Sequence, residues 1–270
     1  MEVNTSSNLR ECFMADPGHV FVIADLAQIE PRITAHYAAQ LHKGMEAKCP
    51  LLQVFTKGID LYAALANEVL GLNLSDDQLT KSVFKKKYPE YRDVGKTIQL
   101  ATTYGLGPDK FAWKLQKVTG REYSYREAKS YIDKYWEKYW DVQALRLAIQ
   151  EEVATKKYID TLFGRKLYLS QAETRHKGLN YKIQCSASDY CLFSQIWVQQ
   201  VAQQYKIPYK LLLIVHDEVV YQVPKGAEEE FSSVLKTIMT LGWTKFKPNL
   251  KLLVPLELDI GVGNSWAAKS

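Results

Sequence analysis

Two short apolar runs, each followed directly by acidic residues, limit what this chain can fold into. The first is HVFVIADLAQIEPR (19–32) and the second is YKLLLIVHDEVVYQV (209–223). Short runs rich in Val, Ile and Leu that are followed by polar residues are typical of buried strands. The second run continues beyond its acidic residues and stops at Pro224, which predicts a β-hairpin with His-Asp-Glu at its turn.

The sequence between these two runs has the pattern of helices. DLYAALANEVLG (60–71) places apolar residues at near-helical spacing and ends with a glycine stop signal. Residues 109–155 predict two or more helices, and 179–205 predicts one long amphipathic helix. A last strand is expected within 250–263. The order of strand, helices, strand pair and final strand predicts an α+β fold in which a helical insertion interrupts a sheet.

The composition excludes several classes of protein. A hydrophobic fraction of 47% and a charged fraction of 24% argue against a disordered chain, and 270 residues can bury a substantial core. The net charge of +5 permits a nucleic-acid partner without arguing for one. No secretory signal and no apolar run of about 20 residues is present, so we expect neither secretion nor a membrane partner. The four cysteines form no CxxC pair and are expected to be buried, reduced thiols.

Two aspartates are candidates for metal chemistry. Asp25 ends the first predicted strand, and Asp217 lies in the predicted hairpin turn about 190 residues later. Hard cations such as Mg²⁺ prefer carboxylate oxygens, and two ions about 3.5–4 Å apart can activate an attacking oxygen and stabilise a leaving one. For either aspartate alone, an acid that ends its strand and faces water remains the stronger interpretation.

A stripe on one predicted helix suggests a ligand with a phosphate tail and a flat base. Arg92, Lys96, Leu100 and Tyr104 recur every four residues, so they share one face of a helix. Arginine can fork onto phosphate oxygens, lysine can act as a point charge, and tyrosine can stack. On its own, a solvated basic face is about as good an explanation of this stripe.

With these residues the sequence resembles the family A DNA polymerases, the bacterial DNA polymerase I type. DLAQIEPR resembles their motif A, RDVGKTIQLATTYG their motif B, and VHDE their motif C. Further similar segments follow in the family's order from about residue 9 to 267. They are DLYAALANEVLG, TLFGRK (161–166), NYKIQCSASD (180–189) and VPLELDIGVGNSW (254–266).

The resemblance implies a right-hand polymerase palm, an antiparallel sheet with flanking helices, that is interrupted by a helical fingers insertion. We expect a first part of the palm at 1–45, fingers at 46–165 and a second part of the palm at 166–270. Because the similarity begins almost at Met1, thumb and exonuclease domains are expected to be absent. The chain is then expected to be a thumbless enzyme, a fragment or one part of a split enzyme, with a partner subunit that supplies thumb or exonuclease functions.

The implied activity is template-directed addition of dNTPs to the 3′-hydroxyl of primer–template DNA, with release of pyrophosphate. Asp25 and Asp217 would hold two Mg²⁺ ions, for which Mn²⁺ can substitute, helped by the backbone carbonyl of Leu26 and with Glu218 as a nearby third acid. Such an enzyme is expected in the cytoplasm and nucleoid or in a viral replication complex.

The resemblance also implies roles for other residues. Lys96 would donate a proton to pyrophosphate, Tyr104 would lie near the templating position, and Glu30 would exclude a ribose 2′-hydroxyl. The residues implied to bind the dNTP are Arg92, Lys96, Leu100, Tyr104, Gln28 and Glu30. Those implied to contact DNA are Arg165, Asn180, Gln184 and His216.

Several positions depart from the family pattern. Leu26 and Ala27 stand where Tyr and Ser are usual, and Pro31, which fits a first helical turn, replaces Leu. Leu100 replaces an aromatic residue and Tyr62 a histidine that helps to bind phosphates. We therefore expect a weaker grip on the triphosphate than is usual in the family.

Other interpretations stay open. The stretch 81–96 carries six basic and two acidic residues, and it suits contact with template phosphates as well as it suits a solvated loop. A catalytically weak DNA-binding or replisome accessory protein that keeps the fold is one alternative function. A relative of the single-subunit RNA polymerases is another, although Glu30 argues against it.

Overall fold

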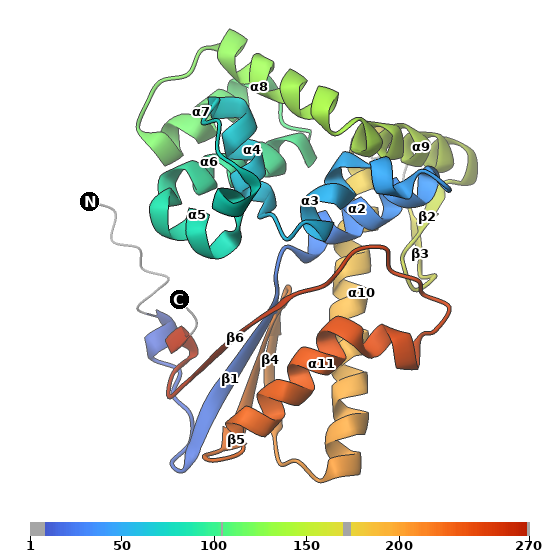
Figure 1. The fold of residues 1–270 in the computed structure, drawn as a ribbon. Helices are drawn as coiled ribbons and strands as arrows, with labels where there is room; N and C mark the ends of the chain where they lie inside the picture. The colour runs from blue at the N-terminus through green and yellow to red at the C-terminus, as the bar shows by residue number, and fades with distance from the viewer. Residues whose placement is uncertain (1–8, 104, 170–173, 269–270) are drawn as a thin grey trace. The chain divides into compact units, whose positions relative to one another are not determined.

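The computed structural model describes residues 9–103, 105–169 and 174–268 (Figure 1). The chain forms two compact units, one made of Met1–Glu30 and Cys185–Ser270 and the other of Pro31–Gln184. The boundaries that we predicted for palm and fingers, after residues 45 and 165, both fall inside the second unit. The assignment of palm and fingers to these ranges remains a prediction.

The first unit is built on a four-stranded antiparallel sheet, which confirms the predicted α+β fold. The strand order is β4-β5-β1-β6. The strands are β1 (His19–Leu26), β4 (Lys210–Val215), β5 (Glu218–Pro224) and β6 (Leu258–Gly263). The two apolar runs of the sequence therefore pair as β1 and the hairpin β4–β5, while only the end of the predicted 250–263 strand is extended.

Helices α10 (Thr174–Tyr205) and α11 (Glu228–Phe246) contribute to the packing of the first unit. Helix α11 packs on β1, β5 and β6, and the later part of α10 packs on α11. The rings of Trp197 and Phe246 stack with centroids 5.7 Å apart, and the Tyr190 hydroxyl donates to the Met239 carbonyl at 3.1 Å. On the hairpin, Tyr221 is fully buried, and the centroid of its ring lies 5.0 Å from that of Phe231 on α11.

The prediction that the whole 211–215 run is buried is wrong. Strand β4 lies at the edge of the sheet and pairs with β5 alone. The side chains of Leu211, Leu212, Leu213 and Ile214 are 38–43% exposed. An edge strand has a neighbour on one side only, so a continuous apolar run cannot by itself predict burial.

The second unit is mainly helical. Among its described residues, α2 continues from the first unit, further helices and a small β-hairpin follow in chain order, and the first part of α10 ends the unit. These elements are α2 (Ile29–Leu41), α3 (Pro50–Thr56), α4 (Leu61–Leu70), α5 (Lys81–Lys87), α6 (Pro89–Thr103), α7 (Pro108–Thr119), α8 (Tyr125–Lys138), α9 (Trp140–Lys156), β2 (Tyr158–Asp160) and β3 (Lys166–Tyr168).

Local signals explain where these helices start and stop. The Asp60 carboxylate caps α4 by accepting from the Ala63 amide, and Gly71 ends it with a φ of 65°. This confirms the helix predicted at 60–71. Pro31 lies in the first turn of α2, where a proline is tolerated. The basic stretch 81–96 is helical, not a loop, because it forms α5 and the first half of α6.

Two further predictions concern the cysteines and membranes. All four cysteines are free thiols, but only Cys49 and Cys191 are buried, whereas Cys12 is exposed and Cys185 is half-buried. The expectation of four buried thiols is therefore wrong for two of them. Within the described residues, the structure contains no helix with the length and apolarity that a membrane crossing requires.

Burial of His36 predicts an acid-sensitive core. His36 on α2 is fully buried, and desolvation lowers its pKa from 6.5 to about 4. Between these values the unfolded chain binds the proton and the folded chain does not, so stability falls as the pH falls from 6.5 to 4. We expect His36 to contribute a loss of up to about 3 kcal/mol over that window and nothing further below it.

Urea unfolding across that pH range measures the effect. His36→Gln should flatten the pH dependence, even if the variant is less stable at pH 7. His19→Gln removes a histidine outside the core and should keep the slope of the wild type. An unchanged slope in His36→Gln would contradict the assignment to this residue.

Candidate functional site

The pairing of β1 with the β4–β5 hairpin brings the two candidate aspartates to the same end of the sheet. Asp25 is the Cα partner of Glu218, the first residue of β5. The turn His216–Asp217 immediately precedes it, and the Leu26 amide donates to the Asp217 carbonyl at 3.3 Å. His216 has a φ of 58°, a left-handed conformation that tightens the turn. Residues about 190 positions apart thus become neighbours.

Asp25 and Asp217 both act electrostatically on one buried thiol. Cys191 on α10 is 1% exposed, and its pKa is raised to about 12, mainly by desolvation. The negative charges of Asp217 and Asp25 add to this increase. Both side chains are half-buried. Since Coulombic interactions weaken with distance, both carboxylates lie close enough to Cys191 to act on one thiol.

The sheet also aligns two further acids with Asp25. Glu218 on β5 and Asp259 on β6 are its Cα partners on either side, and directly opposite residues of antiparallel strands share a face of the sheet. Nevertheless, in the described part of the chain no group of three or more His, Cys, Asp or Glu side chains is arranged to hold a metal ion. Carboxylate oxygens are the hard ligands that Mg²⁺ prefers, and the assignment of Asp25 and Asp217 as metal ligands remains a prediction.

Glu218 is engaged by segments from both ends of the chain. Its Oε1 accepts from Trp266 Nε1 at 2.7 Å, and its Oε2 accepts from Arg10 Nη1 at 3.2 Å. The Arg10 guanidinium also lies 4.7 Å from the centroid of the Trp266 ring. With a side chain only 9% exposed, Glu218 is a buried anchor of the hairpin. Each donor uses one of the lone pairs of its oxygen, so the possible metal role of Glu218 remains a prediction.

Backbone contacts hold the two terminal segments against each other. The Trp266 amide donates to the Phe13 carbonyl at 3.0 Å, and the Ala15 amide donates to the Asn264 carbonyl at 2.9 Å. Neither Arg10 nor Trp266 was predicted as a site residue from the sequence. The similarity of 254–266 to the family's C-terminal end marked the segment, but nothing local indicated that Trp266 would reach Glu218.

In the second unit, helix α6 carries the predicted cationic stripe. Lys96 is exposed, Leu100 is half-buried, and Tyr104 lies outside the described residues. The Arg92 side chain is restrained by hydrogen bonds, because its Nε and Nη2 donate to Asp60 Oδ2 at 3.3 and 2.9 Å. Its guanidinium also lies 4.9 Å from the centroid of the Tyr62 ring. The stripe therefore contains one anchored cation and one exposed cation.

A glycine allows α6 to approach α4 at this point. A Cβ added to Gly95 would lie 1.9 Å from the Tyr62 carbonyl oxygen, far inside van der Waals contact. Only a residue without a side chain permits this separation. Gly95 comes three positions after Arg92, so both lie on the face of α6 that meets α4.

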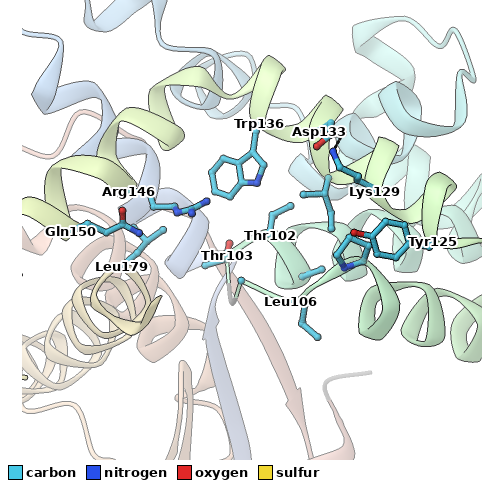
Figure 2. A pocket seen from close by; sticks show the side chains of 14 residues that line it. Thr102, Thr103, Leu106, Tyr125, Lys129, Asp133, Trp136, Arg146, Gln150 and Leu179 are labelled. Carbon is cyan, nitrogen blue, oxygen red and sulfur yellow. Dashed lines mark hydrogen bonds and ion pairs between the residues drawn. The ribbon is translucent and has the colours of Figure 1, made fainter. Parts of the chain in front are cut away.

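A cavity of about 400 Å³ lies beside the end of α6 (Figure 2). Thr103 and Gly105, the neighbours of Tyr104 in the chain, both line it. Figure 2 shows Trp136 and Arg146 on its wall, and the guanidinium lies 5.2 Å from the centroid of the Trp136 ring. An aromatic face with a nearby cation can receive a flat, anionic ligand.

The remaining predicted residues occupy varied environments. Arg165 is exposed in the β2–β3 hairpin, and His216 is exposed in its turn. Asn180 is buried, whereas Gln184 is half-buried, both on α10. Burial of Asn180 weakens the case for a direct contact with DNA.

Gln28 and Glu30 lie immediately after β1. Gln28 adopts a left-handed φ of 54° before α2 begins, and Glu30 is half-buried in the first turn of that helix. Both are thereby held within a few residues of Asp25. Their roles in nucleotide binding remain predictions.

Comparisons with known proteins bear on this site. The family described as DNA polymerase family A matches residues 1–268. Thermostable DNA polymerase I of Thermus thermophilus is 28% identical over 267 residues, which cover 96% of this chain and 28% of that protein. DNA polymerase I of Pseudomonas aeruginosa is 29% identical over 267 residues, which cover 96% of this chain and 26% of that protein.

A solved structure is also similar. It is described as the POL domain of Pol1 from M. smegmatis in complex with DNA primer-template and dNTP. It matches with a TM-score of 0.77 and 26% sequence identity, over 99% of this chain and 44% of that chain. This chain spans only about a quarter of the length of the curated relatives it matches.

The contact between Trp266 and Glu218 yields a stability prediction. Trp266→Phe keeps an aromatic ring, although a smaller one, but removes the indole N–H, so a buried carboxylate loses one of its donors. Loss of a hydrogen bond to a charged group should lower the free energy of unfolding by about 2 kcal/mol. Urea unfolding followed by circular dichroism measures this, with Trp113→Phe at a 55% exposed position as the control. Equal stability of the two variants would show that the contact is dispensable.

Proposed function

The chain belongs to DNA polymerase family A, and from that premise we propose that it carries out template-directed addition of dNTPs to a primer 3′-hydroxyl with release of pyrophosphate. The observation that carries this proposal is the convergence of Asp25 and the Asp217 turn at one end of the sheet. The M. smegmatis domain was solved with primer-template and dNTP, which supports the same ligands here.

We propose that Asp25 and Asp217 bind divalent cations, Mg²⁺ or Mn²⁺, with the backbone carbonyl of Leu26. When bound, such ions neutralise charge on the reacting phosphate and make the attacking hydroxyl more acidic. The two carboxylates provide hard oxygen donors, with Asp25 near the end of β1 and Asp217 in the turn of the hairpin. Glu218 then acts as the anchor of the turn, given its bonds to Arg10 and Trp266.

We propose that the residues of the α6 stripe bind the incoming nucleotide. Arg92 can fork onto phosphate oxygens, and Lys96 supplies an exposed positive charge and a proton for the departing pyrophosphate. Leu100 offers the sugar an apolar surface in place of a ring. Gln28 and Glu30 are assigned to the nucleotide side of β1, with Glu30 excluding a ribose 2′-hydroxyl.

We propose that exposed side chains and the cavity beside α6 contact the DNA. Arg165 and His216 are exposed and suit contacts with the primer–template, whereas Gln184 and the buried Asn180 suit indirect roles. The cavity lined by Trp136 and Arg146 is the candidate site for an unpaired template base, because aromatic faces stack on bases. Tyr104 lies outside the described residues, and its role near the templating position rests on the family resemblance alone.

Primer extension by the 270-residue chain tests the proposal. Asp217→Asn keeps the size of the side chain but removes its charge, so the rate of nucleotide addition should fall by at least about 10³-fold. Glu229→Gln removes an exposed acid on α11 in the same unit and should keep the rate. DNA binding without extension by the wild type, even with Mn²⁺, would favour an accessory role. Equal rates in the two variants would contradict the assignment of Asp217.

A further inference from the structure

A buried carboxylate beside the α6 stripe has no role in the chemistry assigned so far. The side chain of Asp60 is 1% exposed, yet it forms an ion pair with Arg92 and precedes helix α4. Its Oδ1 accepts from the Ala63 amide at 3.0 Å, and its Oδ2 accepts from both Nε and Nη2 of Arg92. A single acid thus caps one helix and holds a cation of another.

The Arg92 side chain is restrained in more than one direction. Asp60 fixes the edge of the guanidinium formed by Nε and Nη2, while the Tyr62 ring lies 4.9 Å from its central carbon. Helices α4 and α6 lie side by side in Figure 1, and Gly95 lets their backbones meet beside Tyr62. A long side chain that is normally mobile is therefore held in one place.

The unused edge of the guanidinium points away from Asp60. Arginine has five N–H donors in a rigid fork, and the pair with Asp60 engages the side edge, leaving the end edge formed by Nη1 and Nη2. The Arg92 side chain is 16% exposed, so part of it reaches solvent. That end edge matches two oxygens of a phosphate.

We propose that Asp60 is a positioning residue that holds Arg92 so that its end edge meets the triphosphate of an incoming dNTP. This rests on the proposed function of the α6 stripe. Asp60 compensates the positive charge of Arg92. Arg92 therefore contributes correctly placed N–H donors to triphosphate binding, whereas Lys96 contributes the uncompensated positive charge. Tyr62, which stands where the family has a histidine, serves as the platform for Arg92 and not as a second phosphate donor.

Nucleotide binding measured without catalysis tests this proposal. The probe is a dNTP titrated into the whole chain and followed by calorimetry. Asp60→Asn and Asp60→Ser both keep a good helix cap but lose the charged acceptor. Each should weaken dNTP binding about tenfold, as Arg92→Met does. The double variant Asp60→Asn with Arg92→Met should bind no more weakly than Arg92→Met alone, because positioning acts through Arg92.

Two further variants separate positioning from stability and from charge. Ser124→Ala removes the cap of α8 and should lower the melting temperature without changing dNTP affinity. Arg92→Lys keeps the charge but not the fork, and it should bind as weakly as Arg92→Met. Wild-type affinity in Asp60→Asn, additive losses in the double variant, or no dNTP binding by the wild type would overturn the proposal. If binding follows the expected pattern but no primer is extended, the proposed function fails while the role of Asp60 stands.

Discussion

The pairing of β1 with β5 is the interaction on which the rest of the candidate site depends. It places Asp25 opposite Glu218 and joins the end of β1 to the turn that carries Asp217. A slip of one residue would move every side chain of β1 to the other face of the sheet, so the position of Asp25 beside the hairpin depends on this register. Arg10 and Trp266 add to this by holding Glu218 from the two ends of the chain.

In the second unit, the main constraint is the restraint of the Arg92 side chain. Arg92 would be mobile on an isolated helix, but Asp60, Tyr62 and the contact at Gly95 restrain it. Family members with a histidine at the position of Tyr62 have a further phosphate donor. Here the Tyr62 ring lies against the Arg92 guanidinium, and the weaker grip on the triphosphate remains a prediction.

The sequence was sufficient for features that depend on local patterns. Strand β1, the hairpin, the capped helix α4 and the long helix α10 follow from apolar runs, turn residues and caps. The exposure of Leu211–Ile214 did not follow, because an apolar run does not say whether its strand lies at an edge. The partners of Arg92 and Glu218 were equally out of reach, since Asp60, Arg10 and Trp266 are distant in sequence and only folding brings them near.

The most direct measurement of the Asp25–Asp217 pair is a Mn²⁺ titration in which electron paramagnetic resonance reports the free ion. If the two carboxylates share bound cations, Asp25→Asn and Asp217→Asn should each weaken Mn²⁺ binding by at least about tenfold. Glu229→Gln should bind Mn²⁺ as the wild type does. Wild-type affinity in both aspartate variants would show that the pairing of β1 with the hairpin does not create a metal site.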